Sequence, residues 1–169
     1  MPIEVRELTP DEHAEAGRVT ADAYRPYVRP GEHERSWRDY LLEIADIADR
    51  ARRTVVLGAF DDDGRIVGTL TLELDGRVDE GEVERPLDEG EAHVRMVGVA
   101  PEAQGRGIGR LLMEASIERA RAAEEPHRLV HLHRGRHPRR GVQGEHGLAR
   151  GPDTPVDYDV VLLSYSLPI

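Results

Sequence analysis

The spacing of hydrophobic and polar positions predicts a strand followed by two helices in the first part of the chain. Residues 3–8 alternate apolar and charged side chains, a period typical of a half-buried strand. Thr9 and, three residues later, Glu12 form a capping-box pattern around a proline, which predicts a helix that runs to about Tyr24. Residues 34–52 carry one Trp and several aliphatic side chains at helical spacing, and they predict a second helix.

Short apolar runs then predict further strands. Residues 54–60 and 66–72 are rich in β-branched and aliphatic side chains, and the segment 61–64 between them ends in Asp-Gly, so a β-hairpin is expected. Residues 75–91 contain eight acidic residues and two arginines, which indicates a solvated loop. The alternative interpretation is a lip that attracts a cationic acceptor. Residues 158–167 are again rich in β-formers and predict a closing strand.

The central feature is a strand, a glycine-rich turn and a helix in direct succession. Residues 94–99 form a short β-branched run, and residues 108–121 place apolar side chains at helical spacing. Between and at the start of these segments, Gly105, Gly107 and Gly109 let the backbone pass close to a ligand and leave N–H groups pointing outward. The helix N-terminus adds a partial positive charge. The pattern therefore predicts a cradle for an anion, and a pyrophosphate is the natural candidate.

Length and composition restrict the class of protein further. At 169 residues the chain is expected to form one domain over residues 1–169, with a core of its own. There is no run of eighteen apolar residues and no secretory pattern at the start, so we expect a cytoplasmic protein without a membrane partner. The chain has no cysteine, which excludes disulfides, thiolate metal sites and a cysteine nucleophile. The net charge of −10 argues against nucleic acid as the main partner and leaves cationic amines open.

The central motif resembles motif A of the GCN5-related N-acetyltransferases (GNAT), which reads Gln/Arg-x-x-Gly-x-Gly/Ala. Residues Gln104 to Gly109 match that pattern, and residues 97–102 resemble the strand and loop that precede it. The resemblance implies an α/β single-domain acyl-CoA N-acyltransferase fold, with a mixed, mostly antiparallel sheet flanked by helices. It also implies acetyl-CoA as co-substrate and an amine acceptor. Nothing in the sequence suggests a metal or a covalent enzyme intermediate, so direct transfer to the amine is the favoured mechanism.

The same resemblance assigns roles to individual residues. The backbone of Val97, Gly98 and Val99 would bind the thioester and the pantetheine arm. The pyrophosphate would lie on the motif itself, with charge added by two arginines; this part of the site comprises Gln104, Gly105, Arg106, Gly107, Ile108, Gly109 and Arg110. The two helices near the start of the chain border the acceptor pocket in the family. Four aromatic side chains there are candidates either for that pocket or for the core: Tyr24, Tyr27, Trp37 and Tyr40.

The general base is harder to assign, because the family places it variably. His93 lies on the strand before the motif, where some members have a glutamate base, and imidazole titrates near neutral pH. We therefore name His93 as the candidate base, with a purely structural histidine as the alternative. Glu73 and Glu91, at the ends of neighbouring strands, are weaker candidates.

The chain departs from the family pattern at residues 131–148. A fifth strand is expected to start at Leu129, but the family's following helix, with its Tyr-x-x-x-Gly-Phe, is missing, and residues 128–150 hold six arginines and one acid. Our hypothesis is a shifted reading frame: residues 133–148 can be encoded so that a one-base shift gives TADDIRAAVYKASMG and a final Phe codon. The alternatives are an irregular solvated loop, or a ligand site with RNA or with a metal held by His127, His131, His133 and His137.

Three functions remain open at this point. The leading one is acetyl-CoA-dependent N-acetylation of an amine, either a small molecule or a peptide N-terminus. The second is a catalytically impaired member of the same fold that binds CoA or a partner, because the tyrosine that often protonates the CoA thiolate is absent. The third and weakest is a nucleic-acid-binding protein that uses the basic residues 128–150. The identity of the acceptor is open, and so is assembly into a homodimer.

Overall fold

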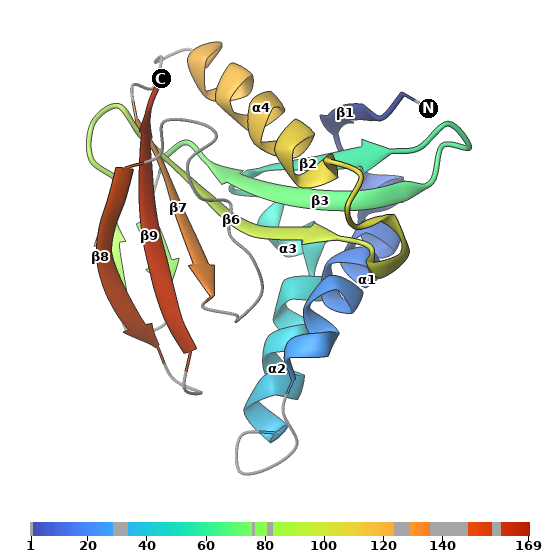
Figure 1. Ribbon diagram of the computed structural model, residues 1–169, viewed down its shortest axis with the longest axis horizontal. Helices are drawn as coiled ribbons and strands as arrows, with labels where there is room; N and C mark the ends of the chain where they lie inside the picture. Colours follow the sequence, from blue (N-terminus) through green and yellow to red (C-terminus); the bar gives the residue numbers. More distant parts are fainter. Residues whose placement is uncertain are drawn as a thin grey trace. The chain divides into compact units, whose positions relative to one another are not determined.

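A computed structural model describes most of the chain: residues 2–28, 34–75, 77–80, 83–123, 129–135, 149–156 and 160–169 (Figure 1). The chain divides into two compact units. The first unit comprises residues 1–72 and 96–116, and the second comprises residues 73–95 and 117–169. The chain passes between the units inside three of its elements, so one strand or helix can contribute residues to both.

The first unit contains the hairpin that the sequence predicts. Strand β1 (Glu4–Glu7) pairs antiparallel with β2 (Val55–Phe60), and β2 pairs antiparallel with β3 (Ile66–Glu73). The turn between β2 and β3 is closed by Gly64, which has a φ of 75° and donates its N–H to the carbonyl of Asp61 at 2.9 Å. The Asp-Gly signal is thus confirmed as the turn of a hairpin.

The predicted first helix is also present. A 3₁₀ turn, η1 (Pro10–Glu12), leads into α1 (His13–Tyr24), and a second 3₁₀ turn, η2 (Arg25–Tyr27), follows it. The Glu12 carboxylate accepts a hydrogen bond of 2.8 Å from the N–H of Thr9, as a capping box requires.

The prediction of one continuous helix over residues 34–52 is wrong. The structure has α2 (Glu34–Ala45) and a separate short helix α3 (Ile47–Arg50). Asp46 interrupts them with a ψ of 72°, and its side chain accepts a 3.0 Å hydrogen bond from Asp49 N–H, which caps α3. The apolar periodicity continues across this break, because Ile44 and Ile47 are both buried. Periodicity alone therefore could not reveal an aspartate acting as an N-cap.

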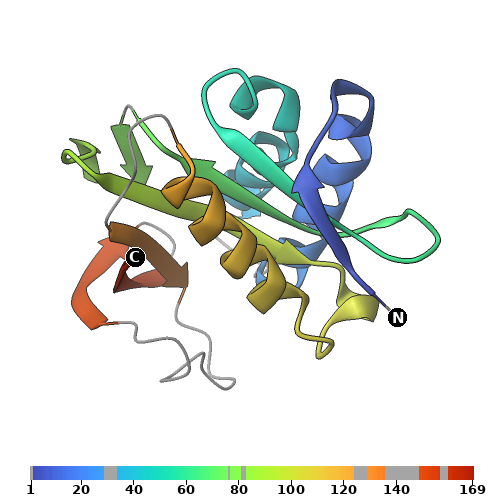
Figure 2. The same cartoon turned by 90° about the horizontal axis from the view of Figure 1, so that it is seen from above.

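Helices cover both faces of the sheet in the first unit. Helices α1, α2 and α3 lie on one face, and the first part of α4 (Ile108–Arg121) lies on the other (Figures 1 and 2). On the side of the first three helices, a buried cluster joins the helices to the strands, with Leu8, Ala16, Ile47, Val56, Phe60 and Ile66 as members. The sheet is thus covered by helices on both faces, and this cluster is the apolar layer on the side of α1, α2 and α3.

The second unit is built mainly from strands. Strand β6 (Glu91–Val99) enters it with residues 91–95, and the hydrogen-bonded order is β6, β7 (Leu129–Gly135), β9 (Val160–Pro168), β8 (Ala149–Val156). Strands β6 and β7 are parallel, whereas β7–β9 and β8–β9 are antiparallel. The expected strands from Leu129 and near residues 158–167 are thereby found, and β8 is an additional strand.

Residues 75–91, predicted as a solvated loop, contain a second sheet. Strands β4 (Arg77–Glu80) and β5 (Val83–Pro86) form an antiparallel pair in the second unit. The loop prediction is wrong because acidic side chains obscured the signal of the two valines, whereas the ladder itself is made by backbone groups that every residue but proline carries in full.

The segment that prompted the frame-shift hypothesis is only partly visible. Residues 129–135 form β7, and residues 136–148 lie outside the described residues, so the hypothesis stays a prediction. None of the helices in the described ranges is both long and apolar enough to cross a membrane.

An ion pair near the N-terminus gives a testable dependence of stability on pH. Glu12 accepts hydrogen bonds of 2.6 and 2.9 Å from Arg6, and these bonds, together with the one from Thr9, lower the pKa of Glu12 from 4.5 to about 2. Because the folded-state pKa is depressed, this stabilisation is present above pH 4.5 and is lost as the pH falls toward 2. Urea unfolding at about pH 7 and about pH 3 should show a smaller loss of stability on acidification in Glu12→Gln than in the wild type. Equal losses in the two proteins would contradict this assignment.

Candidate functional site

The glycine-rich turn before α4 requires glycine at two positions. Gly105 has a φ of 80° and Gly107 a φ of 76°, a backbone region that residues with a side chain rarely adopt. A Cβ added at either glycine would meet no atom within 4 Å. The positive φ values thus account for the glycines, and among the described residues a side chain at either position would project into open space.

The same turn presents backbone donors. In the described part of the chain, the N–H groups of residues 105–109 donate to no backbone acceptor, and the first bonds of the helical series run from Arg110 and Leu111 to the carbonyl of Gly107 at 3.0 and 3.1 Å. Free N–H groups at the N-terminus of a helix form a site for an anion, because the helix dipole adds to them. The turn thus has donors of the kind that an anion site needs, and the anion cradle itself stays a prediction.

Close packing holds the start of α4 against the sheet. Ile108 and Leu112 are buried, and they lie over Gly68 of β3. A Cβ on Gly68 would come within 2.9 Å of Ile108 Cγ2 and within 3.1 Å of Leu112 Cδ1. Because Gly68 has no side chain, α4 can pack at its observed distance from β3. The position of the glycine-rich turn before α4 depends on this contact.

The strand that leads into the turn is irregular at its midpoint. Met96 has a φ of 52°, the one positive value among the described non-glycine residues. Among the described residues, the parallel ladder between β6 and β7 pairs Glu91 to Val94 with Leu129 to Leu132, and β6 itself continues to Val99. A positive φ in a buried, non-glycine strand residue indicates local strain, which is frequent at functional sites.

Beyond Met96, the peptide groups of β6 alternate in direction. The N–H of Ala100 donates to the carbonyl of Val67 in β3 at 3.0 Å, so the peptide groups of Val97 and Val99 face away from β3. The carbonyl of Val99 accepts a 3.3 Å hydrogen bond from Gln104 Nε2. Gln104, predicted as part of the co-substrate site, thus ties the turn to the strand through its side chain.

The remaining predicted residues of the cradle differ in their surroundings. Gly98 is buried against α1, and a Cβ there would lie 3.1 Å from the Cβ of Ala23. Arg106 is exposed at the turn, whereas Arg110 forms an ion pair of 2.7 Å with Glu114 one helical turn later. The structure therefore brings the backbone of residues 97–99 and 104–109 into one unit, and it shows that part of the charge of Arg110 is already engaged.

The four predicted aromatic residues form one cluster in the first unit. Tyr24 lies with its ring centroid 6.3 Å from both Tyr27 and Tyr40, and Trp37 lies 5.9 Å from Tyr40, all with edge-to-face geometry. Trp37 is buried, and Tyr27 is 37 % exposed. The cluster is thus partly core and partly exposed to solvent. Both roles predicted for these residues, core packing and lining of an acceptor pocket, therefore stay open.

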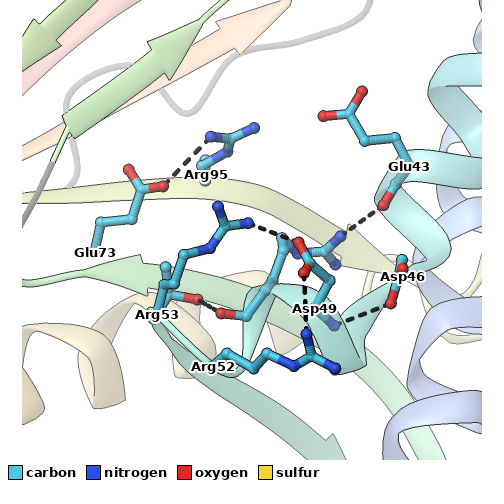
Figure 3. A network of polar contacts seen from close by, with 9 residues as sticks. Glu43, Asp46, Asp49, Arg52, Arg53, Glu73 and Arg95 are labelled. Carbon is cyan, nitrogen blue, oxygen red and sulfur yellow. Dashed lines mark hydrogen bonds and ion pairs between the residues drawn. The ribbon is translucent and has the colours of Figure 1, made fainter.

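His93 is enclosed in the second unit beside Glu73, which also binds Arg95. Its side chain has no exposed surface, and Nδ1 lies 2.8 Å from Glu73 Oε2. The other oxygen of Glu73 accepts a 3.3 Å hydrogen bond from Arg95 Nη1 (Figure 3). Sequence reasoning named Glu73 only as a weaker base and did not name Arg95. The sequence could have shown that residues 93 and 95 share one face of β6, because they are two positions apart. The register that brings Glu73 of β3 beside them is set by tertiary structure and could not be predicted.

Comparison with known proteins places this geometry in a family. Residues 17–142 match the model of the acetyltransferase (GNAT) family. No curated protein matches the chain. Similar solved structures include a histone acetyltransferase HPA2 and related acetyltransferase from Corynebacterium glutamicum, with 17% identity, a TM-score of 0.67 and coverage of 100% of this chain and 98% of that one.

Two further solved structures were determined with a bound ligand. The PaiA N-acetyltransferase from Thermoplasma acidophilum, in complex with coenzyme A, has 16% identity, a TM-score of 0.68 and 100% coverage of both chains. A GNAT family acetyltransferase from Brucella melitensis, in complex with acetyl-CoA, has 25% identity, a TM-score of 0.53 and 94% coverage of both chains.

Because the family model matches most of its length, this chain belongs to the acetyltransferase (GNAT) family. The predicted α/β fold, with a mostly antiparallel sheet flanked by helices, is confirmed as the fold of that family.

Proposed function

We propose that this protein transfers an acetyl group from acetyl-CoA directly to an amine. The observation that carries the proposal is the turn at residues 105–109, with two glycines of positive φ beside open space and a run of N–H groups without backbone acceptors. These features fit a diphosphate, which needs several donors and a close approach of the backbone. The coenzyme A and acetyl-CoA complexes of the two similar structures support this choice of ligand.

In this proposal, each part of the motif has its own role. The N–H groups of residues 105–109 hold the pyrophosphate, and Arg106 adds charge from an exposed position, with Arg110 beside it. The outward-facing peptide groups of Val97 and Val99 bind the pantetheine arm and the thioester, and Gly98 lets the strand pack against α1. When bound, acetyl-CoA supplies an acetyl group activated as a thioester.

His93 is the proposed general base. The amine loses a proton as its nitrogen forms the new amide bond and the C–S bond of the thioester breaks, and His93 takes up this proton. The imidazole has no exposed surface in the free protein, so this role requires that substrate binding opens a path to it. Solvent protonates the departing thiolate, because the family's usual tyrosine has no counterpart in the printed sequence.

The acceptor class follows from charge. The net charge of −10 and the acidic residues 75–91 favour a cationic amine, either a small molecule or a peptide N-terminus. The partly exposed aromatic cluster around Tyr24 supplies apolar and cation-binding surface for such an acceptor.

The experiment that tests this function is a thiol-release assay. The chain contains no cysteine, so a thiol reagent reports only the CoA that the reaction sets free. We expect acetyl-CoA turnover with at least one member of a panel of polyamines, amino acids, aminoglycosides and short peptides, and we expect His93→Gln to lower kcat by about 100-fold or more. Binding of acetyl-CoA without turnover of any amine would instead identify a CoA-binding member that has lost catalysis.

A further inference from the structure

We propose that Thr20 and Thr69 are positioning residues, whose hydroxyl groups set the distance between α1 and the strand that binds the thioester. This inference rests on the proposed function, in which residues 97–99 of β6 hold the thioester and the aromatic cluster at the end of α1 contacts the acceptor. Thr20 lies in α1 and Thr69 in β3, and each is 1 % exposed. Both belong to the first unit, and their Oγ1 atoms are 2.7 Å apart.

The direction of this hydrogen bond follows from a second bond of Thr20. Thr20 Oγ1 donates to the carbonyl of Ala16, one turn earlier in α1, at 2.8 Å. Since a hydroxyl group has a single proton, Thr20 can only accept from Thr69. The Thr69 hydroxyl therefore donates to Thr20, and the two bonds connect β3 through Thr20 to the backbone of α1.

The hydroxyl pair lies beside Gly98 of β6. A Cβ added to Gly98 would lie 3.1 Å from the Cβ of Ala23. It would also lie 3.5 Å from the Cα of Thr20 and 3.6 Å from Oγ1 of Thr69. Helix α1 thus packs on the backbone of β6, the neighbour of β3 in the sheet, with no side chain of Gly98 between them. The peptide groups on either side of Gly98 are those that we assign to the pantetheine arm and the thioester.

The same helix carries the proposed acceptor surface. Ala23, which packs against Gly98, is followed by Tyr24, whose ring centroid lies 6.3 Å from those of Tyr27 and Tyr40. A change in the distance of α1 from β6 would therefore also change the distance between the acceptor and the thioester. Because the amine nitrogen must approach the thioester carbon closely and in a defined direction, a displacement of about 1 Å can lower the rate by about 100-fold.

Two hydroxyl groups allow a closer approach than two methyl groups do. The two oxygens are 2.7 Å apart, whereas carbon atoms pack best at about 3.5–4.0 Å. The double substitution Thr20→Val/Thr69→Val replaces each hydroxyl by a methyl group and should move α1 away from the sheet by about 1 Å. It removes donor and acceptor together, so no hydroxyl is left buried without a partner, and the stability should stay close to that of the wild type.

Kinetics, calorimetry and unfolding of this double variant separate a positioning role from a structural one. With the best amine of the panel, we expect kcat/KM to fall by between about 10-fold and 100-fold. Acetyl-CoA should bind with unchanged affinity, because residues 97–99 and 105–109 stay in place. The midpoint of urea unfolding should also stay close to that of the wild type. A double variant with wild-type stability and wild-type kcat/KM would overturn the proposal, since the pair would then serve the core alone.

Conservative variants test the hydroxyl groups themselves. Thr20→Ser and Thr69→Ser each keep the hydroxyl pair and remove one methyl group, so kcat/KM should stay close to that of the wild type. A serine variant that loses as much kcat/KM as the double valine variant would contradict the role of the hydroxyls. The matched control is Thr54→Val, because Thr54 Oγ1 also donates to a carbonyl four residues earlier, that of Arg50, at 2.9 Å, but lies just before β2. This control should leave kcat/KM unchanged.

Crystal structures of the wild type and of the double valine variant measure the displacement without an acceptor. We expect the distance between the Cα atoms of residues 20 and 98 to increase by about 1 Å in the variant. An unchanged distance would overturn the proposal, whatever the kinetics of the variant.

The outcomes distinguish the two proposals. A wild-type enzyme that acetylates an amine, together with an unchanged Cα distance or an unchanged kcat/KM in the double variant, overturns the role of the pair and leaves the proposed function standing. A wild-type protein that acetylates no amine of the panel overturns the proposed function and with it the catalytic purpose of the pair. The two crystal structures then show separately whether the hydroxyls set the distance of α1 from β6.

Discussion

Replacement of Gly107 by alanine is expected to weaken acetyl-CoA binding by about 100-fold or more while the protein remains folded. The new Cβ meets no protein atom within 4 Å, so it projects into the space where the ligand would approach. The φ of 76° also becomes strained, and relief of that strain turns the neighbouring N–H groups away. Loss of two hydrogen bonds to a charged group, each worth about 1.5 kcal/mol or more, corresponds to this change in affinity.

Gly64→Ala is the matched control for this prediction. Gly64 has a φ of 75°, and a Cβ there would also meet nothing within 4 Å, but it lies in the hairpin turn between β2 and β3. Both variants should lose a similar free energy of unfolding, about 1–2 kcal/mol for an L-residue in this conformation. Only Gly107→Ala should lose affinity in calorimetric titration with acetyl-CoA. Equal affinities of the two variants would show that the turn before α4 is not the binding site.

The second large effect is expected at Gly68, where function depends on packing. A side chain there would collide with Ile108 and Leu112 of α4, and with the carbonyl of Gly98 at 3.1 Å. The valine would force α4 away from the sheet. Gly68→Val should therefore lower the free energy of unfolding by about 3 kcal/mol, which is in the upper part of the usual range for overpacking. The displaced helix should also lose its affinity for acetyl-CoA.

A graded series makes the Gly68 prediction specific. Gly68→Ala adds one carbon and should produce a smaller loss in urea unfolding than Gly68→Val, with affinity reduced in the same order. A valine variant that unfolds at the wild-type urea concentration would contradict the packing argument. A valine variant that is destabilised but binds acetyl-CoA normally would show that the cradle does not depend on the height of α4.

Much of the fold could be predicted from the sequence, because local chemistry and tertiary structure agree over most elements. The capping box at Thr9, the Asp-Gly turn ending at Gly64 and the apolar face of α4 each specify their element by local hydrogen bonds or periodicity. The glycine-rich turn before α4 belongs to the same group. Its glycines can be read in the sequence, since a backbone that needs a positive φ constrains the residue type strongly.

Other features could not be predicted because they depend on register and long-range packing. The contact of Glu73 with His93 requires two strands to be aligned over twenty residues of sequence separation, and no local pattern encodes it. The sequence also gives no indication of the strained φ of Met96, because methionine has no preference for that backbone region. The break at Asp46 and the acidic hairpin β4–β5 were missed for the reverse reason: a strong local pattern suggested a different structure.

The most direct test of the proposed function is calorimetric titration of the wild-type chain with acetyl-CoA, with CoA, and with S-acetylpantetheine, which lacks the pyrophosphate. If residues 105–109 cradle a pyrophosphate, acetyl-CoA and CoA should bind at one site with similar affinity, and S-acetylpantetheine should bind far more weakly. Equal affinity for all three compounds would contradict the cradle. Absence of binding by acetyl-CoA and CoA would contradict the proposed activity as a whole.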